Sequence, residues 1–179
     1  KKNIACTRSF DRDYHTFDEL KERVSTFAHV CATKLRQQGS RCRSIHVFIL
    51  SNAFRRDRPN YQKSITIDLP FETNSSMELS HFAVDALRKI FRPGYAYKRV
   101  GVMVMDLTPE KNTQLGIWEN TNQRQNSLLA VVDKLNRALG RDKVKLASQD
   151  LGRTWKMRQE NLSRRYTTRL DEIITIYCR

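Results

Sequence analysis

The chain has 179 residues, of which 39% are hydrophobic and 29% are charged, and its formal net charge is +14. This composition is typical of a globular protein and excludes collagen-like and disordered classes. No segment approaches the ~18 consecutive apolar residues of a membrane span, and the polar start at residues 1–3 is unlike a secretory signal. We therefore expect one or two compact units in the cytoplasm, with no membrane partner.

The positive charge is concentrated toward the two ends of the chain. Lysine and arginine outnumber aspartate and glutamate by 19 to 11 in residues 1–107, by 4 to 3 in residues 108–139 and by 10 to 5 in residues 140–179. This excess favours a nucleic-acid partner, because neutralising phosphates releases counterions. On charge alone, an anionic surface, an acidic protein or a basic surface without a dedicated partner are the alternatives.

The cysteines and histidines do not indicate a metal site. No pair of cysteines has C-x-x-C spacing, which argues against zinc and against a redox dithiol. We expect reduced thiols, with Cys31 on the apolar side of a helix. The residues in question are Cys6, Cys31, Cys42, Cys178, His15, His29, His46 and His81.

Residues 4–39 have the pattern of a strand followed by an amphipathic helix. The strand is expected over residues 4–10, and Thr16 with Glu19 matches a capping box that satisfies free backbone N–H groups of the first turn. Gly39 can end this helix in a left-handed conformation. The helix carries one apolar stripe at three- and four-residue spacing, made by Leu20, Val24, Phe27, Cys31 and Leu35.

Two further strands follow this helix. The first is expected over residues 44–50 and the second over about residues 61–69, after a basic turn at residues 55–59. The second strand alternates between an apolar and a polar face, which predicts that one face is core and the other solvated. The apolar side is Ile65, Ile67 and Leu69, and the polar side is Gln62, Ser64, Thr66 and Asp68.

A second helix and a fourth strand complete this half of the chain. The helix begins near Ser75, with a capping box to Glu78. A basic aromatic segment from Tyr95 to Arg99 then leads into a nearly continuous apolar run over residues 100–107. Such a run indicates a buried central strand. Its basic lead-in is expected at one end of the sheet, where a polyanion could bind.

The predicted order is β-α-β-β-α-β, the split βαβ arrangement. Right-handed crossovers place both helices on one face of a four-stranded sheet and leave the other face open. We expect that open face to bear Arg8, Gln62, Ser64 and Thr66, and to suit a phosphate backbone. An ordinary solvated face is the alternative.

The remaining sequence divides into a linker and a small module. Residues 108–123 are polar except for Leu115, Ile117 and Trp118, so this short apolar segment fits a groove on another protein or packs back on a neighbouring domain. A third helix is expected over residues 123–139, ended by Gly140, with short strands near residues 144–147 and 173–176. The stripe predicted for that helix is Leu128, Val132, Leu135 and Leu139.

The fold class is therefore α+β. We predict a βαββαβ domain over residues 1–107, a linker over residues 108–123 and a small α+β module over residues 124–179. The chain lacks a nucleotide-binding glycine loop, H-E-x-x-H and G-x-S-x-G. It also lacks the paired carboxylates that a two-metal phosphoryl-transfer site requires. The sequence therefore favours a binding module and predicts no catalytic or metal-ligating residue.

Several motifs along the whole chain resemble the C-terminal part of UmuC-type Y-family DNA polymerases, which act in translesion synthesis during the SOS response. The second half is the more specific, since its motifs are not general among Y-family polymerases. The matching residues are Thr7–Phe10, Tyr61–Ser64, Arg92–Val102, Trp155–Glu160 and Leu162–Arg169. Asp11 departs from the pattern, in which a glycine is expected.

The resemblance implies that residues 1–107 form a little-finger domain whose open sheet face rests in the major groove of primer–template DNA and contacts backbone phosphates. Such contacts carry no sequence preference. Carried over by position, the implied contacts are Thr7, Arg8, Ser9, Arg43, Arg55, Gln62, Lys63, Ser64, Lys98 and Arg99.

The resemblance also implies protein partners. Gln114, Leu115, Ile117 and Trp118 are similar to the sliding-clamp-binding peptide of bacterial polymerases, with Ile117 in place of Leu and Trp118 in place of Phe. Residues 124–179 resemble a C-terminal accessory domain, for which docking of processed UmuD, docking of RecA and a second DNA contact are the open alternatives. Catalysis and its Mg²⁺ are expected in the whole polymerase, and no cofactor is expected in these residues.

Two other functions remain as alternatives. One is a free-standing protein-interaction adaptor whose basic charge serves solubility alone. The other is an RNA-binding module, although such sheets present stacked aromatic residues on their central strands and only Phe48 is a candidate here. Three observations distinguish these functions. The polymerase domain predicts salt-dependent duplex binding, the adaptor predicts no such binding, and the RNA-binding module predicts a preference for single-stranded RNA.

Overall fold

The structure is a computed structural model, and it describes residues 2–55, 57, 59–110, 123–140, 143–149, 161–174 and 176. Three predicted features lie outside the described residues. They are the clamp-binding residues Gln114, Leu115, Ile117 and Trp118, the Trp155–Glu160 motif and the thiol of Cys178.

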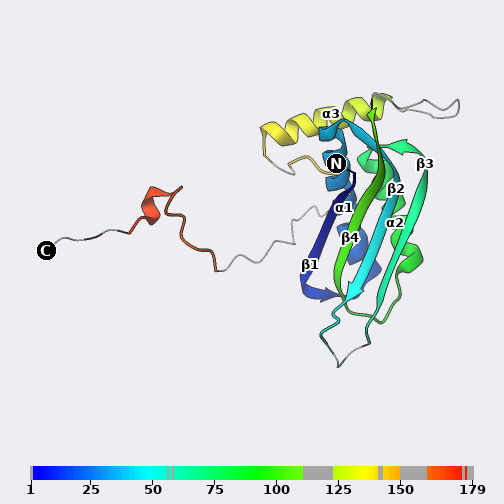
Figure 1. Cartoon of the computed structure of the whole chain (residues 1–179), viewed down its shortest axis with the longest axis horizontal. Coiled ribbons are helices and arrows are strands. Elements are labelled where there is room, and N and C mark those ends of the chain that lie inside the picture. Colours follow the sequence, from blue (N-terminus) through cyan, green and yellow to red (C-terminus); the bar gives the residue numbers. More distant parts are fainter. Residues whose placement is uncertain are drawn as a thin grey trace.

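The first part of the chain folds in the predicted β-α-β-β-α-β order (Figure 1). A third helix and a short 3-10 turn follow, whereas the strands predicted near residues 144–147 and 173–176 do not form in the described residues of those ranges. The elements are β1 (Ile4–Tyr14), α1 (Phe17–Gln38), β2 (Ser40–Ser51), β3 (Gln62–Thr73), α2 (Ser76–Ile90), β4 (Tyr97–Pro109), α3 (Gln123–Ala138) and η2 (Leu170–Glu172).

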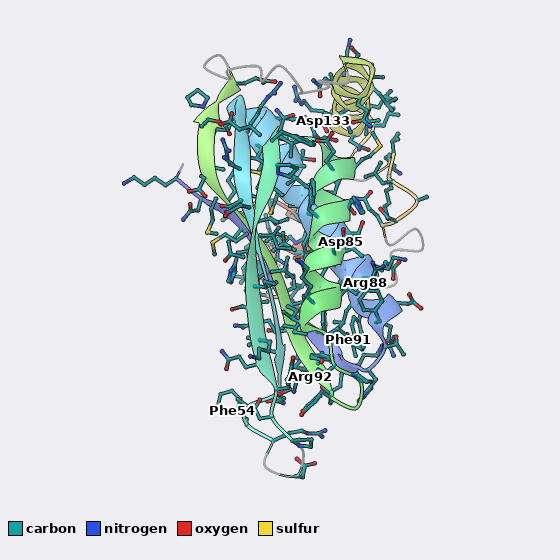
Figure 2. All side chains as sticks on the ribbon, turned by 90° about the vertical axis from the view of Figure 1, so that its right-hand side faces the viewer. Phe54, Asp85, Arg88, Phe91, Arg92 and Asp133 are labelled. Carbon is teal, nitrogen blue, oxygen red and sulfur yellow. The ribbon has the colours of Figure 1, made fainter. Side chains whose placement is uncertain are left out.

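The four strands form one antiparallel sheet in the order β1-β4-β2-β3. Strand β4 is therefore central, as its apolar sequence predicts, while β1 and β3 are edge strands. Helix α1 packs on β1 and β4, and α2 packs on β2 and β3. Both helices lie on the same side of the sheet (Figure 2). We call the opposite side the open face.

Helix α1 begins and ends as its sequence predicts. The backbone N–H of Glu19 donates to the hydroxyl of Thr16 over 3.3 Å, and the Glu19 carboxylate accepts from the backbone N–H of Thr16 over 3.2 Å. Gly39 ends the helix with φ of +63°, a conformation that glycine adopts without the steric strain of a Cβ. These local signals fix α1 independently of the sheet on which it packs.

Helix α2 forms only half of its predicted capping box. Ser75 accepts a hydrogen bond from the backbone N–H of Glu78, as expected. The carboxylate of Glu78, however, accepts from the hydroxyl of Thr73, the last residue of β3. The side chain of Glu78 thus joins the helix to the preceding strand.

The core lies between the sheet and the two helices. The predicted stripe of α1 is buried, and Leu20, Val24, Cys31 and Leu35 are fully inaccessible. Burial raises the pKa of the Cys31 thiol to about 12. This confirms the prediction that Cys31 lies on the apolar side of its helix. A thiol buried in this way is unreactive.

The segment between α2 and β4 turns its aromatic residues inward. Tyr97 is fully buried, and its hydroxyl donates to the carbonyl of Arg92 over 2.7 Å and accepts from the Arg92 N–H over 3.0 Å. Burial raises the pKa of the Tyr97 hydroxyl. Gly94 takes a φ of +89° at the turn between them. Much of the Arg92–Val102 motif therefore serves to connect α2 to β4. Lys98 and Arg99 are the residues of the motif that lie at the end of the sheet.

Helix α3 packs on α1 through a different face from the predicted one. The buried apolar residue is Leu129, which is 1% exposed, whereas Leu128, Leu135 and Leu139 are 54%, 39% and 63% exposed. The predicted stripe is wrong because a polar contact orients the helix. The carboxylate of Asp133 accepts two hydrogen bonds from the guanidinium of Arg36, at 2.7 and 2.9 Å.

Candidate nucleic-acid interface

The strand register arranges the open face in transverse rows, each with one residue from every strand. With β strands about 4.8 Å apart, one row spans about 14 Å. The first row is Ser9, Arg99, Leu50 and Gln62; the second is Thr7, Gly101, Phe48 and Ser64; the third is Ala5, Met103, His46 and Thr66. Five of the predicted DNA-contacting residues therefore lie in two neighbouring rows, namely Thr7, Ser9, Gln62, Ser64 and Arg99.

The first row presents an oriented cation. The Nε–H of Arg99 donates to the hydroxyl of Ser9 over 2.9 Å, and both residues are exposed. An arginine has four further N–H donors on its terminal nitrogens. The bond to Ser9 thus fixes the plane of the guanidinium, while these donors are placed for an anion. A phosphate is a suitable partner, because it can accept two of them at once.

The second row has an apolar centre that requires a glycine. A Cβ atom at Gly101 would lie 2.3 Å from two ring atoms of Phe48 and 2.6 Å from the Cγ2 of Thr7. Only glycine therefore lets the Phe48 ring lie across β4. His46 is beside this ring, with 6.2 Å between centroids, and its Nδ1 is 2.9 Å from the hydroxyl of Thr66. The middle of the open face is consequently apolar at Phe48 and Gly101 and weakly polar at His46 and Thr66.

This arrangement corrects part of the expectation that the open face bears Arg8, Gln62, Ser64 and Thr66. In the three open-face rows described above, Arg99 is the one residue with a permanent charge. The prediction that Arg8 lies on this face is wrong, since Arg8 pairs with the buried Val100 on the helix side. Alternation with Ile4, Cys6 and Phe10, all buried, was the sequence signal for this placement.

Lys63 shares the helix-side register with Arg8. It pairs with the fully buried Ile49 and is exposed at the start of β3. Arg8 and Lys63 thus lie on the two opposite edge strands of the sheet. They belong to one helix-side row, Arg8, Val100, Ile49 and Lys63, which is adjacent in register to the first two rows of the open face. Two exposed cations therefore flank the open face.

The remaining cations predicted at this end of the sheet are partly neutralised. Lys98 lies at a bulge of β4, where its Nζ donates to the carbonyl of Asp11 over 2.9 Å and lies 4.0 Å from the Asp13 carboxylate. Arg55, in the loop after β2, has a terminal nitrogen 3.6 Å from the other carboxylate oxygen of Asp13. These side chains therefore stabilise the end of the sheet and contribute less free charge than Arg99.

Arg43 is separated from the other predicted contacts. It lies between Cys42 and Ser44, at a register irregularity of β2 and at the far end of the strand from Leu50. Nearby, the hydroxyl of Ser44 donates to the Asp106 carboxylate over 2.5 Å, and Asp106 takes a positive φ of 52°. The structure therefore does not bring Arg43 into the two rows.

Sequence reasoning missed the apolar part of the face. Phe48 was considered only as a base-stacking candidate, while Leu50 and Met103 were not assigned to the open face at all. The signal was available in the alternation of β2, since Val47 and Ile49 are buried and Phe48 and Leu50 are half-buried on the other side. The continuous apolar run of β4 concealed the same alternation at Met103.

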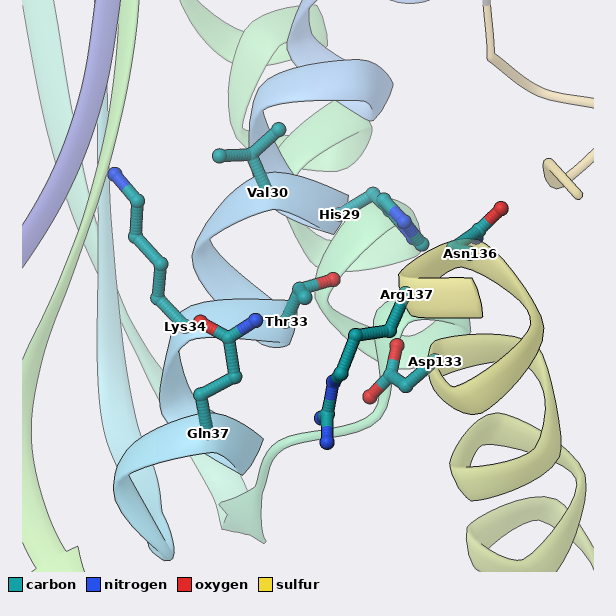
Figure 3. A pocket seen from close by; sticks show the side chains of 8 residues that line it. All are labelled: His29, Val30, Thr33, Lys34, Gln37, Asp133, Asn136 and Arg137. Carbon is teal, nitrogen blue, oxygen red and sulfur yellow. The ribbon is translucent and has the colours of Figure 1, made fainter. Parts of the chain in front are cut away.

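A cavity between α1 and α3 is a weaker candidate site (Figure 3). Its volume is about 280 Å³, and His29, Thr33, Asp133 and Asn136 are among its lining residues. Asp133 is already paired with Arg36. The side-chain amide of Asn136 donates to the Val144 carbonyl and accepts from the Val144 N–H, each over 2.8 Å. Its polar groups therefore serve mainly to hold α3 and the residues after it.

The described part of the chain shows neither a metal cluster nor a membrane helix. None of its groups of histidine, cysteine, aspartate and glutamate side chains is arranged to hold a metal ion. Within the same residues, every helix is too short or too polar to cross a bilayer. The open face is thus the feature that best fits a ligand-binding role.

Comparison with known proteins identifies the family. Residues 1–117 match the model of the impB/mucB/samB family C-terminal domain, and residues 126–176 match a family described as a domain of unknown function (DUF4113). The first match covers more than half of the chain. The chain therefore belongs to the impB/mucB/samB family.

Individual relatives agree with this assignment. The chain is 33% identical to protein UmuC of Salmonella typhimurium strain LT2 over 98% of its length and 42% of that protein. It is 33% identical to protein ImpB of Salmonella typhimurium, over 97% of the chain and 41% of that protein. The chain thus spans about two fifths of the length of these curated relatives, and it is a UmuC-type C-terminal segment.

Solved structures give weaker likenesses. One is the insertion ternary complex of Dbh DNA polymerase, with a TM-score of 0.47 and 11% identity over 57% of this chain and 28% of that chain. Another is the complex of the beta-clamp processivity factor and the little finger domain of PolIV, with a TM-score of 0.43 and 16% identity over 65% of this chain and 99% of that chain. At these scores, the likenesses carry no argument about function.

Proposed function

We propose that residues 1–107 grip the backbone of primer–template DNA through the open face, as the little-finger domain of an error-prone Y-family polymerase in translesion synthesis. The observation that carries this proposal is the register, which gathers Thr7, Ser9, Gln62, Ser64 and Arg99 in two neighbouring rows. Family membership supports it. Lesion bypass in the cytoplasm, as part of the SOS response, belongs to the same proposal.

The dimensions and chemistry of the face suit a duplex. A row spans about 14 Å, which is close to the ~12 Å width of the major groove of B-DNA. Hydroxyl, amide and guanidinium donors along the first two rows can bind phosphate oxygens. The apolar centre around Phe48 has no donors for base edges. Such a face grips DNA without selecting a sequence.

The salt dependence of duplex binding tests this proposal. Removing Lys63 and Arg99 together, as Lys63→Ala with Arg99→Ala, should weaken binding and flatten the slope of log affinity against log salt by about two units. The control is Lys21→Ala with Lys89→Ala, which removes the same charge from exposed positions on α1 and α2. Equal slopes for the two double variants would show that DNA binds neither on the open face, at Arg99, nor at the edge that flanks it, at Lys63.

We also propose that Gln114, Leu115, Ile117 and Trp118 dock on the sliding clamp. An apolar peptide in a polar linker can bind a groove on a partner without distorting a fold. Gln114→Ala with Trp118→Ala should abolish clamp binding and leave duplex affinity unchanged. Asn112→Ala with Asn120→Ala is the matched control in the same segment. Clamp binding that survives the first change would contradict this part of the proposal.

The activity of the whole protein is a further part of the proposal. We propose that nucleotide transfer, with its Mg²⁺, is carried out by parts of the parent polymerase that correspond to the rest of the UmuC sequence. No polymerase activity is then expected from residues 1–179 alone. Docking of processed UmuD or RecA on residues 124–179, and a second DNA contact there, stay predictions.

A further inference from the structure

The loop between β2 and β3 ends in an aromatic side chain that is almost fully solvated. Phe54 is 96% exposed, the largest exposure among the large hydrophobic residues of the described chain. It lies in the loop beyond the end of the sheet, with its side chain pointing away from the loop (Figure 2). Among the described aromatic residues, no ring lies against it. Such a ring is accessible to a ligand.

The loop holds Phe54 outward through local hydrogen bonds. The backbone N–H of Phe54 donates to the side-chain carbonyl of Asn52 over 3.1 Å, and the N–H of Arg55 donates to the Asn52 carbonyl over 3.2 Å. At the base of the loop, the N–H of Ser51 donates to the Tyr61 carbonyl over 2.9 Å. The hydroxyl of Tyr61 is anchored on the Ile90 carbonyl over 2.7 Å. The described part of the loop around Phe54 is therefore preorganised.

The charge around Phe54 favours a nucleic acid over a protein groove. The four residues that follow it in the sequence are three arginines and one aspartate. Arg55 is half exposed and lies close to Asp13 at the end of β1. An arginine beside an exposed ring gives the combination that binds single strands, namely a cation for the phosphates and an aromatic face for the bases.

The position of the loop connects it to the open face. Strand β2 leaves the first row at Leu50, β3 enters it at Gln62, and the loop spans the residues between them. A DNA strand that passes Arg99 and Gln62 can therefore continue toward Phe54. Within a duplex each base is already stacked on its neighbours, so the exposed ring suits a base that has left the duplex.

We propose that Phe54 stacks on an unpaired base of a DNA strand that extends from the gripped duplex. This inference rests on the proposed function of the open face. It adds a single-strand contact at the end of the sheet, and the nucleobase is recognised through its π face. The contact is therefore tolerant of sequence, as stacking on an aromatic side chain is in general.

The test compares two DNA probes, a blunt duplex and the same duplex with a short single-stranded extension. The wild-type chain should prefer the extended probe. Phe54→Ala should lose roughly 10-fold in affinity for the extended probe, with an unchanged affinity for the blunt one. The fluorescence of a 2-aminopurine in the extension should change on binding to the wild-type chain and not on binding to Phe54→Ala.

Two further variants separate stacking from simple apolar contact. Phe54→Trp should keep the preference for the extended probe, because it keeps an aromatic face, and Phe54→Leu should lose it as Phe54→Ala does. The proposal is overturned if the wild-type chain shows no preference, or if Phe54→Leu retains it. Reduced binding of Phe54→Ala to the sliding clamp, with both DNA affinities intact, would instead assign Phe54 to a protein contact.

Failure of this proposal is distinguishable from failure of the proposed function. The open face is tested on the blunt probe by Lys63→Ala with Arg99→Ala, whereas Phe54 is tested by the ratio of affinities for the two probes. If Lys63→Ala with Arg99→Ala leaves the affinity for the blunt duplex unchanged, the open-face function is contradicted. If Phe54→Ala leaves the ratio of the affinities for the extended and blunt probes unchanged, only the stacking contact is contradicted.

Discussion

The two described parts of the chain hold their shape by different means. In residues 2–110, leucines on both helices are fully buried, among them Leu20, Leu35, Leu79 and Leu87. Among the described residues after 122, Leu129 is the one buried hydrophobic side chain, while Leu139 is 63% and Leu170 is 86% exposed. The first part is stabilised by apolar burial. The second is attached mainly by polar contacts at one end of α3.

That attachment depends on one arginine of α1. Arg36 pairs with Asp133 and also donates to the Asn74 carbonyl over 2.7 Å and the Ser76 hydroxyl over 3.0 Å. Its side chain and that of Asp133 are each 12% exposed. Arg36 thus joins the N-terminal end of α2 to α3. The comparison shows how α3, which buries few apolar residues, can be held on the well-packed residues 2–110 by buried polar contacts.

The largest difference between the two parts is expected for matched leucine substitutions. Leu35→Ala removes a fully buried side chain and leaves a cavity, so it should lower the free energy of unfolding by about 3 kcal/mol. Leu139→Ala removes an exposed side chain and should change it by less than about 0.5 kcal/mol. Urea denaturation followed by circular dichroism measures both. Similar costs at the two positions would show that α3 shares the main core.

A smaller effect is expected from breaking the contact between the two parts. Asp133→Ala leaves the Arg36 guanidinium without its carboxylate, which should destabilise the seating of α3 by about 2 kcal/mol. Hydrogen exchange of the α3 amides should then accelerate roughly 30-fold, with little change in β4. The control is Asp171→Ala, whose side chain is 73% exposed beside Arg169. Unchanged exchange in α3 would mean that other contacts hold the helix.

The smallest effect concerns the cap of α1. Thr16→Ala removes one hydrogen-bond acceptor and should cost about 1 kcal/mol, compared with less than about 0.5 kcal/mol for Ser127→Ala on the exposed side of α3. A cost at Ser127 equal to that at Thr16 would contradict this account of the cap.

The cap also makes a pH-dependent contribution. Burial raises the pKa of Glu19, but hydrogen bonds from Thr16 and His15 and the charge of Arg12 outweigh it, so the pKa is lowered. The contribution of Glu19 is therefore present above its ordinary pKa of about 4.3 and is lost as the pH falls through the lowered value. Glu19→Gln should accordingly make the free energy of unfolding less dependent on pH in this acidic range, which urea denaturation at several pH values measures. An unchanged pH dependence would show that Glu19 is not its source.

The fold of residues 2–110 could be predicted because its signals are local. The capping box of Thr16 and Glu19, the left-handed Gly39 and the alternation of β3 each fix an element without knowledge of its neighbours. The stripe of α3 could not be predicted in the same way. Its orientation depends on Arg36, which is 97 residues away from Asp133 in the sequence.

The candidate site was predicted in part. Thr7, Ser9, Gln62, Ser64 and Arg99 come together because alternation and antiparallel pairing align them across the sheet. Arg8 was misplaced because its charge was given more weight than its alternation with buried neighbours. The order of the strands, and with it the contact of Phe48 and Gly101, follows from packing between distant segments, which one sequence does not specify.

The central claim is that DNA lies on the open face, and methyl resonances of the methionines test it directly. Met103 and Met105 are half-buried in β4 on that face, whereas Met77 is half-buried at the start of α2 on the helix side. With methyl-labelled methionine, adding a blunt duplex should shift or broaden the signals of Met103 and Met105 and leave that of Met77 in place. A perturbed Met77 signal with Met103 and Met105 unchanged would place the DNA on the helices and contradict the account.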